Sequence, residues 1–143
     1  MSTSGAARAL LSAVETFTAA QTFSAGLTTN AATISGALAT SEIISTTRAV
    51  SATYPVALTD EVILADATAA AFVVTLPTAA SVPGRRITVK KIDASVNAVT
   101  VASGGGTIDG AVSIALTAQN WALTVISGGA NWWVVNQVAA GIL

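Results

Sequence analysis

Five carboxylates beyond residue 50 are the side chains of this sequence that could do chemistry: Asp60, Glu61, Asp66, Asp93 and Asp109. Most glycosidases use a pair of such groups on either side of the bond they cleave. The five also have structural interpretations. Asp93 and Asp109 fall at predicted turns, where an Asp side chain bonds its own backbone. Asp60 and Glu61 fit a solvated strand entry. Because no dense run of Asp and Asn occurs, a calcium loop is not indicated either.

Histidine and cysteine are both absent from the chain. The commonest general base, the commonest metal ligand and the usual serine triad are therefore missing, as are thiol nucleophiles and disulfides. The glycine triplet at residues 104–106 lacks the following Lys-Ser or Lys-Thr of a phosphate-binding loop. We predict a protein that is not an enzyme and that holds no cofactor and no metal.

Three tryptophans could serve a second kind of chemistry, the stacking of sugar rings: Trp121, Trp132 and Trp133. The competing interpretation is that they fill a core or an interface, together with Phe72. Neighbouring residues of a strand point to opposite faces, so Trp132 and Trp133 cannot both face the same side. We favour core plus interface for these aromatics and keep the sugar platform as an alternative.

The composition indicates a protein that covers its surface with other chains. Apolar residues make up 52 % of the 143 residues, whereas charged residues make up only 9 %. Soluble domains usually carry about 25 % charged residues. A lone domain normally displays more charge than this chain has. We therefore expect much of the surface to pack against copies of the same chain or against a larger assembly.

Two classes of partner are not expected. The formal net charge is −1, and the cluster Arg85, Arg86, Lys90 and Lys91 would split between the two faces of a strand, so nucleic acid is not a predicted partner. The longest charge-free stretch of the first half, residues 16–41, is rich in Thr, Ser, Gly, Asn and Gln. That composition does not suit a spanning helix, and the apolar run near the N-terminus is too short for a secretory signal. No membrane partner is predicted.

Residues 53–137 show the clearest pattern, with Val-rich segments and turn signals alternating every 8 to 12 residues. This spacing is typical of an all-β sandwich. Phe72, Val74 and Leu76 share one predicted face, and Ile87 and Val89 share another. The uncharged tail at residues 138–143 is interpreted equally well as a frayed end or as a docking peptide.

The first 50 residues differ in character. Leu10, Leu11 and Val14 suit either one short helical turn or an apolar anchor. Beyond them, single large apolar residues are separated by Thr, Ala and Ser, and one such chain buries little by itself. Several copies wound about an axis would bury them, although a poorly ordered linker is the alternative. The anchor or interface candidates are Leu10, Leu11, Val14, Phe17, Phe23, Leu27, Ile34 and Leu38.

The region from about residue 58 to 135 resembles a trimeric β-module of bacteriophage virion proteins. The segments that carry the resemblance are Val74-Thr75-Leu76-Pro77, residues 82–93, 99–101 and 107–110, and Asn131-Trp132-Trp133-Val134-Val135. Such modules occur in capsid decoration (cement), head-fibre and tail-fibre proteins. The resemblance implies a sandwich or jelly-roll body in a homotrimer. The short chain and the absence of a long shaft favour a decoration protein.

The sequence thus leads to one set of expectations. The fold is all-β, an antiparallel β-sandwich or jelly-roll-like domain over residues 51–143, with an extended β-rich anchor and intertwined segment over residues 1–50. The protein is a homotrimeric virion structural protein on the outer capsid surface, where it binds the major capsid protein and stabilises the shell. The alternative function is a tail- or head-fibre component that binds host-surface glycans.

Overall fold

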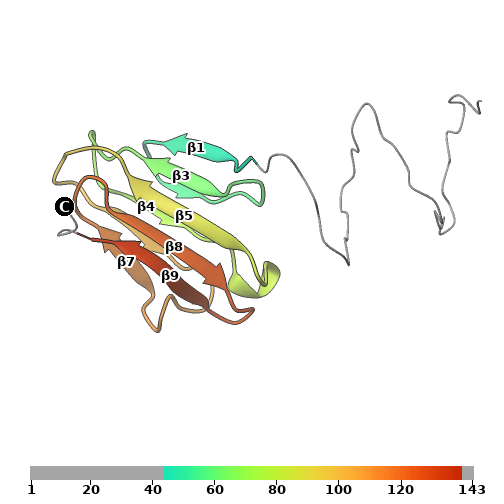
Figure 1. Ribbon diagram of the computed structural model, residues 1–143. Coiled ribbons are helices and arrows are strands. Elements are labelled where there is room, and N and C mark those ends of the chain that lie inside the picture. The colour runs from blue at the N-terminus through green and yellow to red at the C-terminus, as the bar shows by residue number, and fades with distance from the viewer. Residues whose placement is uncertain (1–43, 140–143) are drawn as a thin grey trace, which may run out of the picture. The chain divides into compact units, whose positions relative to one another are not determined.

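The computed structural model describes residues 44–139, and these form nine β-strands in two sheets (Figure 1). The helical part of this region is a single 3-10 turn, η1, at Ala79–Ser81. The described part of the chain is therefore mostly β with almost no helix, which agrees with the predicted class.

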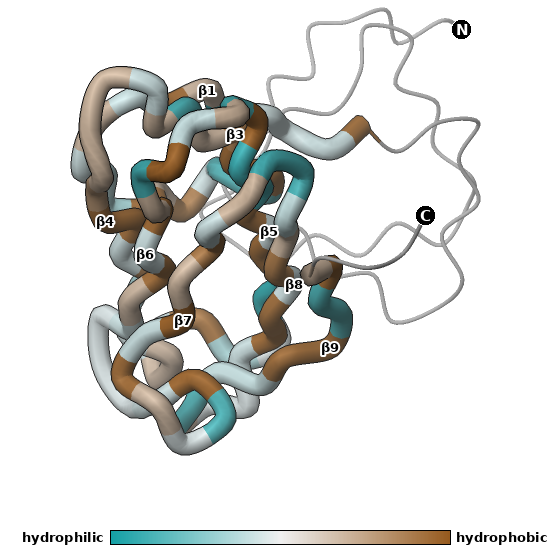
Figure 2. The backbone as a smooth tube through the Cα atoms, turned by 90° about the vertical axis from the view of Figure 1, so that its left-hand side faces the viewer, coloured by the Kyte–Doolittle hydropathy of each residue, from teal (hydrophilic) through white to brown (hydrophobic). Residues whose placement is uncertain are grey.

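The larger sheet has five strands in the order β1-β3-β5-β8-β9. Their bounds are Thr47–Val50 for β1, Val62–Ala65 for β3, Arg86–Lys91 for β5, Ala122–Ser127 for β8 and Trp132–Val138 for β9. The smaller sheet has four strands in the order β2-β4-β6-β7. Their bounds are Tyr54–Pro55 for β2, Phe72–Thr75 for β4, Val99–Ala102 for β6 and Ser113–Leu116 for β7. Figure 2 shows the two sheets as separate layers.

The chain winds between the sheets. From β1 to β6 each strand lies in the sheet opposite to the one before it, so that β1, β3 and β5 alternate with β2, β4 and β6. Neighbouring strands within this part are parallel, as in the pairing of Val62 with Thr88 and of Phe72 with Val99. Three antiparallel pairings, β5 with β8, β6 with β7 and β8 with β9, complete the sheets.

The prediction of an antiparallel sandwich is wrong in this respect, because four of the seven strand pairings are parallel. Parallel neighbours need a long crossover connection. Here a strand of the opposite sheet serves as that crossover. The spacing of strands and turns along the sequence is the same for both arrangements, so it could not distinguish them.

The predicted anchor and intertwined segment lies mostly at residues 1–43, outside the described residues. Its last residues, Thr47–Val50, form β1 and pair with Val62–Ala65 of β3. The five-stranded sheet therefore begins a few residues before the predicted boundary at residue 50. The division into two parts stays a prediction.

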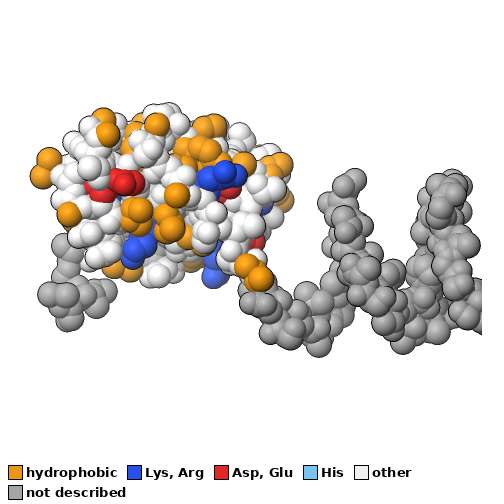
Figure 3. Space-filling model, turned by 90° about the horizontal axis from the view of Figure 1, so that it is seen from above, with side chains coloured by type: hydrophobic (Ala, Val, Ile, Leu, Met, Phe, Trp, Pro, Cys, Tyr) orange, Lys and Arg blue, Asp and Glu red, His pale blue; other side chains and the backbone are white. Residues whose placement is uncertain are grey.

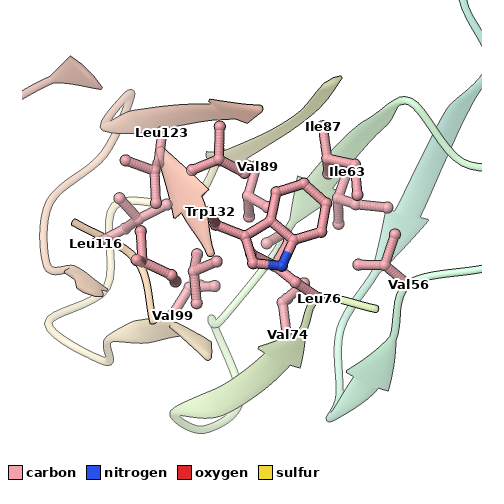
Figure 4. Packing of buried hydrophobic residues seen from close by; sticks show 14 of the residues in the cluster. Val56, Ile63, Val74, Leu76, Ile87, Val89, Val99, Leu116, Leu123 and Trp132 are labelled. Atoms are coloured by element: carbon pink, nitrogen blue, oxygen red, sulfur yellow. The ribbon is translucent and has the colours of Figure 1, made fainter. Parts of the chain in front are cut away.

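Alternating apolar residues from both sheets form one core, in which the indole of Trp132 is central (Figure 4). Trp132 is fully buried, and its Nε1 donates a hydrogen bond to the carbonyl of Pro77 at 3.1 Å. The two faces predicted from alternation are both buried in this core: Phe72, Val74 and Leu76 on one side, and Ile87 and Val89 on the other. Burial of such side chains is the main stabilising contribution to the fold.

Candidate functional site

Asp93 is buried at the end of the sandwich beyond β5 and is saturated with hydrogen-bond donors. The Nζ of Lys91, whose side chain is fully buried, lies 2.5 Å from Asp93 Oδ1. The backbone N–H of Ser95 donates to the same oxygen at 2.9 Å, and the N–H of Ala67 donates to Oδ2 at 2.7 Å. The turn predicted at Asp93 is thus present, and its carboxylate ties two loops to the end of β5.

Burial on its own raises the pKa of Asp93, but the hydrogen bonds from Lys91, Ser95 and the N–H of Ala67 outweigh it and hold that pKa far below its usual range. Asp93 is therefore ionised at neutral pH. A buried cation and a buried anion in contact form a pair that is costly to break from either side.

Asp60 forms a second buried hub. The hydroxyl of Tyr54 and the N–H of Ala57 donate to its Oδ2 at 2.7 and 2.9 Å, and Arg48 Nε lies 3.4 Å from its Oδ1. The guanidinium of Arg85 donates to the Asp60 carbonyl. Asp60 thus joins β1, β2 and the loop before β5 rather than forming a solvated strand entry.

The electrostatics of this hub follow from its contacts. Burial raises the pKa of Asp60, but hydrogen bonds from Tyr54, the Ala57 N–H and Arg48 lower it below the ordinary value. The hydrogen bond to Asp60 raises the pKa of Tyr54. The carboxylate is therefore ionised and fully engaged, which makes it a poor proton donor.

The stability of the protein is expected to fall in acid because of these two carboxylates. Both have a lower pKa in the folded chain than the ordinary value of 3.8. Their stabilising contribution is therefore fully present above about pH 5 and is lost as the pH falls through 4 toward the lowered values. Urea midpoints measured between pH 7 and pH 3 check this. A midpoint that is unchanged or higher at pH 3 would contradict it.

The other three carboxylates are less buried than Asp93 and Asp60, although Asp66 lies near enough to Asp93 for the two charges to interact. The pKa of Asp66 is lowered by hydrogen bonds from the hydroxyl and the N–H of Thr68. Asp109 lies at a tight turn and accepts the N–H of Val134 at 3.1 Å. Glu61 is exposed. Among residues 44–139 no three His, Cys, Asp or Glu side chains are placed to share a metal ion.

The outer face of the four-stranded sheet carries no charged side chain. Strand registers place Val73, Thr100 and Ala115 in one row across β4, β6 and β7, and Thr75, Ala102 and Ser113 in the next. All ten charged residues of the described part lie outside the four strands of this sheet. Figure 3 shows the molecule from above, where Lys, Arg, Asp and Glu side chains form a few separate patches among uncharged ones. The sequence alone shows that these strand segments are uncharged, but only the strand registers show that the residues are neighbours.

The predicted aromatic residues occupy different environments. Phe72 and Trp132 are buried in the core, and Trp121 is partly buried against it. Trp133 points the other way from Trp132, and 52 % of it is exposed. The predicted anchor residues all lie outside the described residues: Leu10, Leu11, Val14, Phe17, Phe23, Leu27, Ile34 and Leu38.

Trp133 stands at the end of a row that alternation within single strands does not reveal. It pairs with Ile126 of β8, which in turn pairs with Arg86 of β5. Alternation places all three on the outer face of the five-stranded sheet. Next to Arg86 is a shallow hollow of about 240 Å³ lined by Ser45, Glu61, Val62, Arg86 and Thr88. Finding this row from sequence would have required the strand partners.

Comparison with models of known protein families and with curated proteins gives no match for this chain. The described residues contain no helix long and apolar enough to cross a membrane.

Proposed function

We propose that the protein is a virion structural protein, a homotrimer that decorates the outer capsid surface of a bacteriophage. It binds the major capsid protein and stabilises the shell, and it catalyses no reaction. The resemblance of residues 58–135 to virion modules supports the class of protein. The jelly-roll-like body and the threefold assembly belong to the same proposal.

The uncharged outer face of the four-stranded sheet is the observation that carries the proposal. Thr100 lies in the middle of this face, between Val73 and Ala115. Small, uncharged side chains on a sheet allow the close approach of a second surface, and no charged side chain has to be desolvated when the two surfaces meet. On a chain with only 9 % charged residues, we expect a face of this kind to pack against sister copies.

The predicted anchor completes the mechanism. Apolar residues such as Leu10 and Leu11 would grip the capsid, each contributing about 1.5–3 kcal/mol if fully buried. Three linked copies strengthen a modest contact through avidity. A trimer that contacts neighbouring capsid subunits at the same time then holds them together against internal pressure.

Replacing Thr100 by lysine is expected to weaken self-association at least about hundredfold, because each interface would bury an unpaired charge. Sedimentation velocity over a range of protein concentrations measures this. The matched control is Thr124→Lys on the outer face of the five-stranded sheet, which is expected to leave assembly unchanged. Equal loss of assembly in both variants, or in neither, would contradict the assignment of this face.

The position in the particle is tested by copy number. Quantitative mass spectrometry of purified virions is expected to find hundreds of copies per particle, and removal of the protein is expected to lower the temperature at which capsids release their genome. A few copies per particle would favour the fibre alternative.

The exposure of Trp133 is the observation that favours this second function, a fibre component that binds host-surface glycans. A fibre protein needs a recognition surface for the host.

A further inference from the structure

We propose that the outer face of the five-stranded sheet binds an acidic oligosaccharide, with one sugar ring stacked on Trp133 and a carboxylate of a neighbouring sugar paired with Arg86. This site goes beyond the capsid function. It lies on the other sheet from the proposed assembly face, so that binding and assembly can be tested and can fail separately.

The first element is the position of the Trp133 indole next to Gly128. A Cβ atom added at Gly128 would come within 2.5 Å of the indole Nε1 and 2.9 Å of Cδ1. The ring of Trp133 therefore lies against the backbone of the β8–β9 hairpin, in a place that only glycine leaves open. With 52 % of the residue exposed, the indole is both held in place and accessible. A held, accessible aromatic ring is suited to stacking, because little conformational freedom remains to be lost on binding.

The second element is the row across the sheet. Trp133 pairs with Ile126, and Ile126 pairs with Arg86. Adjacent strands are about 4.8 Å apart, so the backbones of Trp133 and Arg86 are about 10 Å apart across the sheet. A disaccharide bridges that span. The apolar side chain of Ile126 lies between them, where it can contact the C–H face of a sugar.

The third element is the hollow beside Arg86. Ser45 and Thr88 contribute hydroxyl groups, Glu61 contributes a carboxylate, and Val62 contributes an apolar wall. Hydroxyls and carboxylates are acceptors for sugar O–H groups, and the hydroxyls also donate. Sugar sites combine such polar groups with apolar contact in the same way that other small-molecule sites do.

Charge decides between neutral and acidic sugars. The ion pairs of the described residues join Arg48 to Asp60 and Lys91 to Asp93, and neither involves Arg86. Arg86 is exposed on the outer face, and Lys90 lies on the same face four residues further along β5. A guanidinium binds a carboxylate in a bidentate, charge-assisted manner. Glu61 lies in the same hollow, and its negative charge disfavours the closely spaced phosphates of a nucleic-acid backbone more than a sugar with one carboxylate per ring.

The test is calorimetric titration of the full chain with 3′-sialyllactose and trigalacturonate, each compared with its neutral counterpart. We expect at least one acidic sugar to bind about tenfold tighter than its neutral counterpart, and Arg86→Leu to remove that difference. Trp133→Ala is expected to weaken binding at least about tenfold. Absence of binding to both acidic probes, or tighter binding of a single-stranded oligonucleotide, would overturn the proposal.

Gly128→Ala provides a sharper variant, because it displaces the indole of Trp133 without removing it. We expect it to weaken sugar binding about tenfold as well. The control is Val112→Ala, which truncates an exposed apolar side chain immediately before β7 of the other sheet, and should leave binding unchanged. Near-ultraviolet circular dichroism monitors the packing of Trp132 in each variant. Unchanged binding in a folded Gly128→Ala or Trp133→Ala variant would contradict the site.

Discussion

Replacing Trp132 by alanine is expected to lower the free energy of unfolding by about 3–5 kcal/mol. The indole is fully buried and contacts apolar side chains from both sheets. Its removal leaves a cavity that rigid strands cannot fill, and it also leaves the carbonyl of Pro77 without its donor. Since most small domains are only about 5–15 kcal/mol stable, this loss is a large share of the total.

Urea unfolding at a fixed protein concentration measures the effect, because association would make stability depend on concentration. The matched control is Trp133→Ala, which removes the same side chain from the neighbouring, half-exposed position. It is expected to cost less than about 1 kcal/mol. Trp132→Phe, which keeps much of the packing and loses the hydrogen bond, is expected to fall between them. Equal effects at Trp132 and Trp133 would contradict the orientation of β9.

Asp93→Asn is expected to destabilise the fold by about 3–5 kcal/mol, because Lys91 would be left buried without a counter-charge. The side chain of Lys91 is fully buried, and its Nζ lies 2.5 Å from Asp93 Oδ1. The double variant Lys91→Met with Asp93→Asn is expected to recover a large part of the loss, since it removes both charges. A double-mutant cycle then gives the coupling energy between the two side chains.

The control for this substitution is Asp109→Asn, which changes an exposed carboxylate at a tight turn. We expect a change within about 0.5 kcal/mol, as for most surface substitutions. If Asp93→Asn were as mild as Asp109→Asn, or if Lys91→Met gave no recovery, the buried pair would not hold the loops as described.

The sequence predicted the strands and their inward faces well where alternation was clear. Phe72, Val74 and Leu76 were predicted to share one face and are all buried. The turn at Asp93 was predicted from the tendency of Asp to bond its own backbone, and the N–H of Ser95 makes that bond. These features depend on residues close together in the chain, and local chemistry determines them.

Features that depend on distant residues were not predicted. The parallel pairings of β1 to β6 and the row of Arg86, Ile126 and Trp133 both require knowledge of which strands are neighbours. The same holds for Asp60, which was interpreted as solvated but is buried beneath Tyr54 and Arg48. A single sequence fixes which face of a strand is apolar, but it does not name the strand's partner.

The most direct measurement is the molar mass of the purified chain by multi-angle light scattering at micromolar concentration. A trimer has three times the chain mass of 14.1 kDa, or about 42 kDa, and that is the mass we expect. Its dissociation by Thr100→Lys alone would locate the contact on the four-stranded sheet. A stable, soluble species of 14.1 kDa at these concentrations would show that the uncharged face needs no sister copy, and the proposed trimer would be wrong.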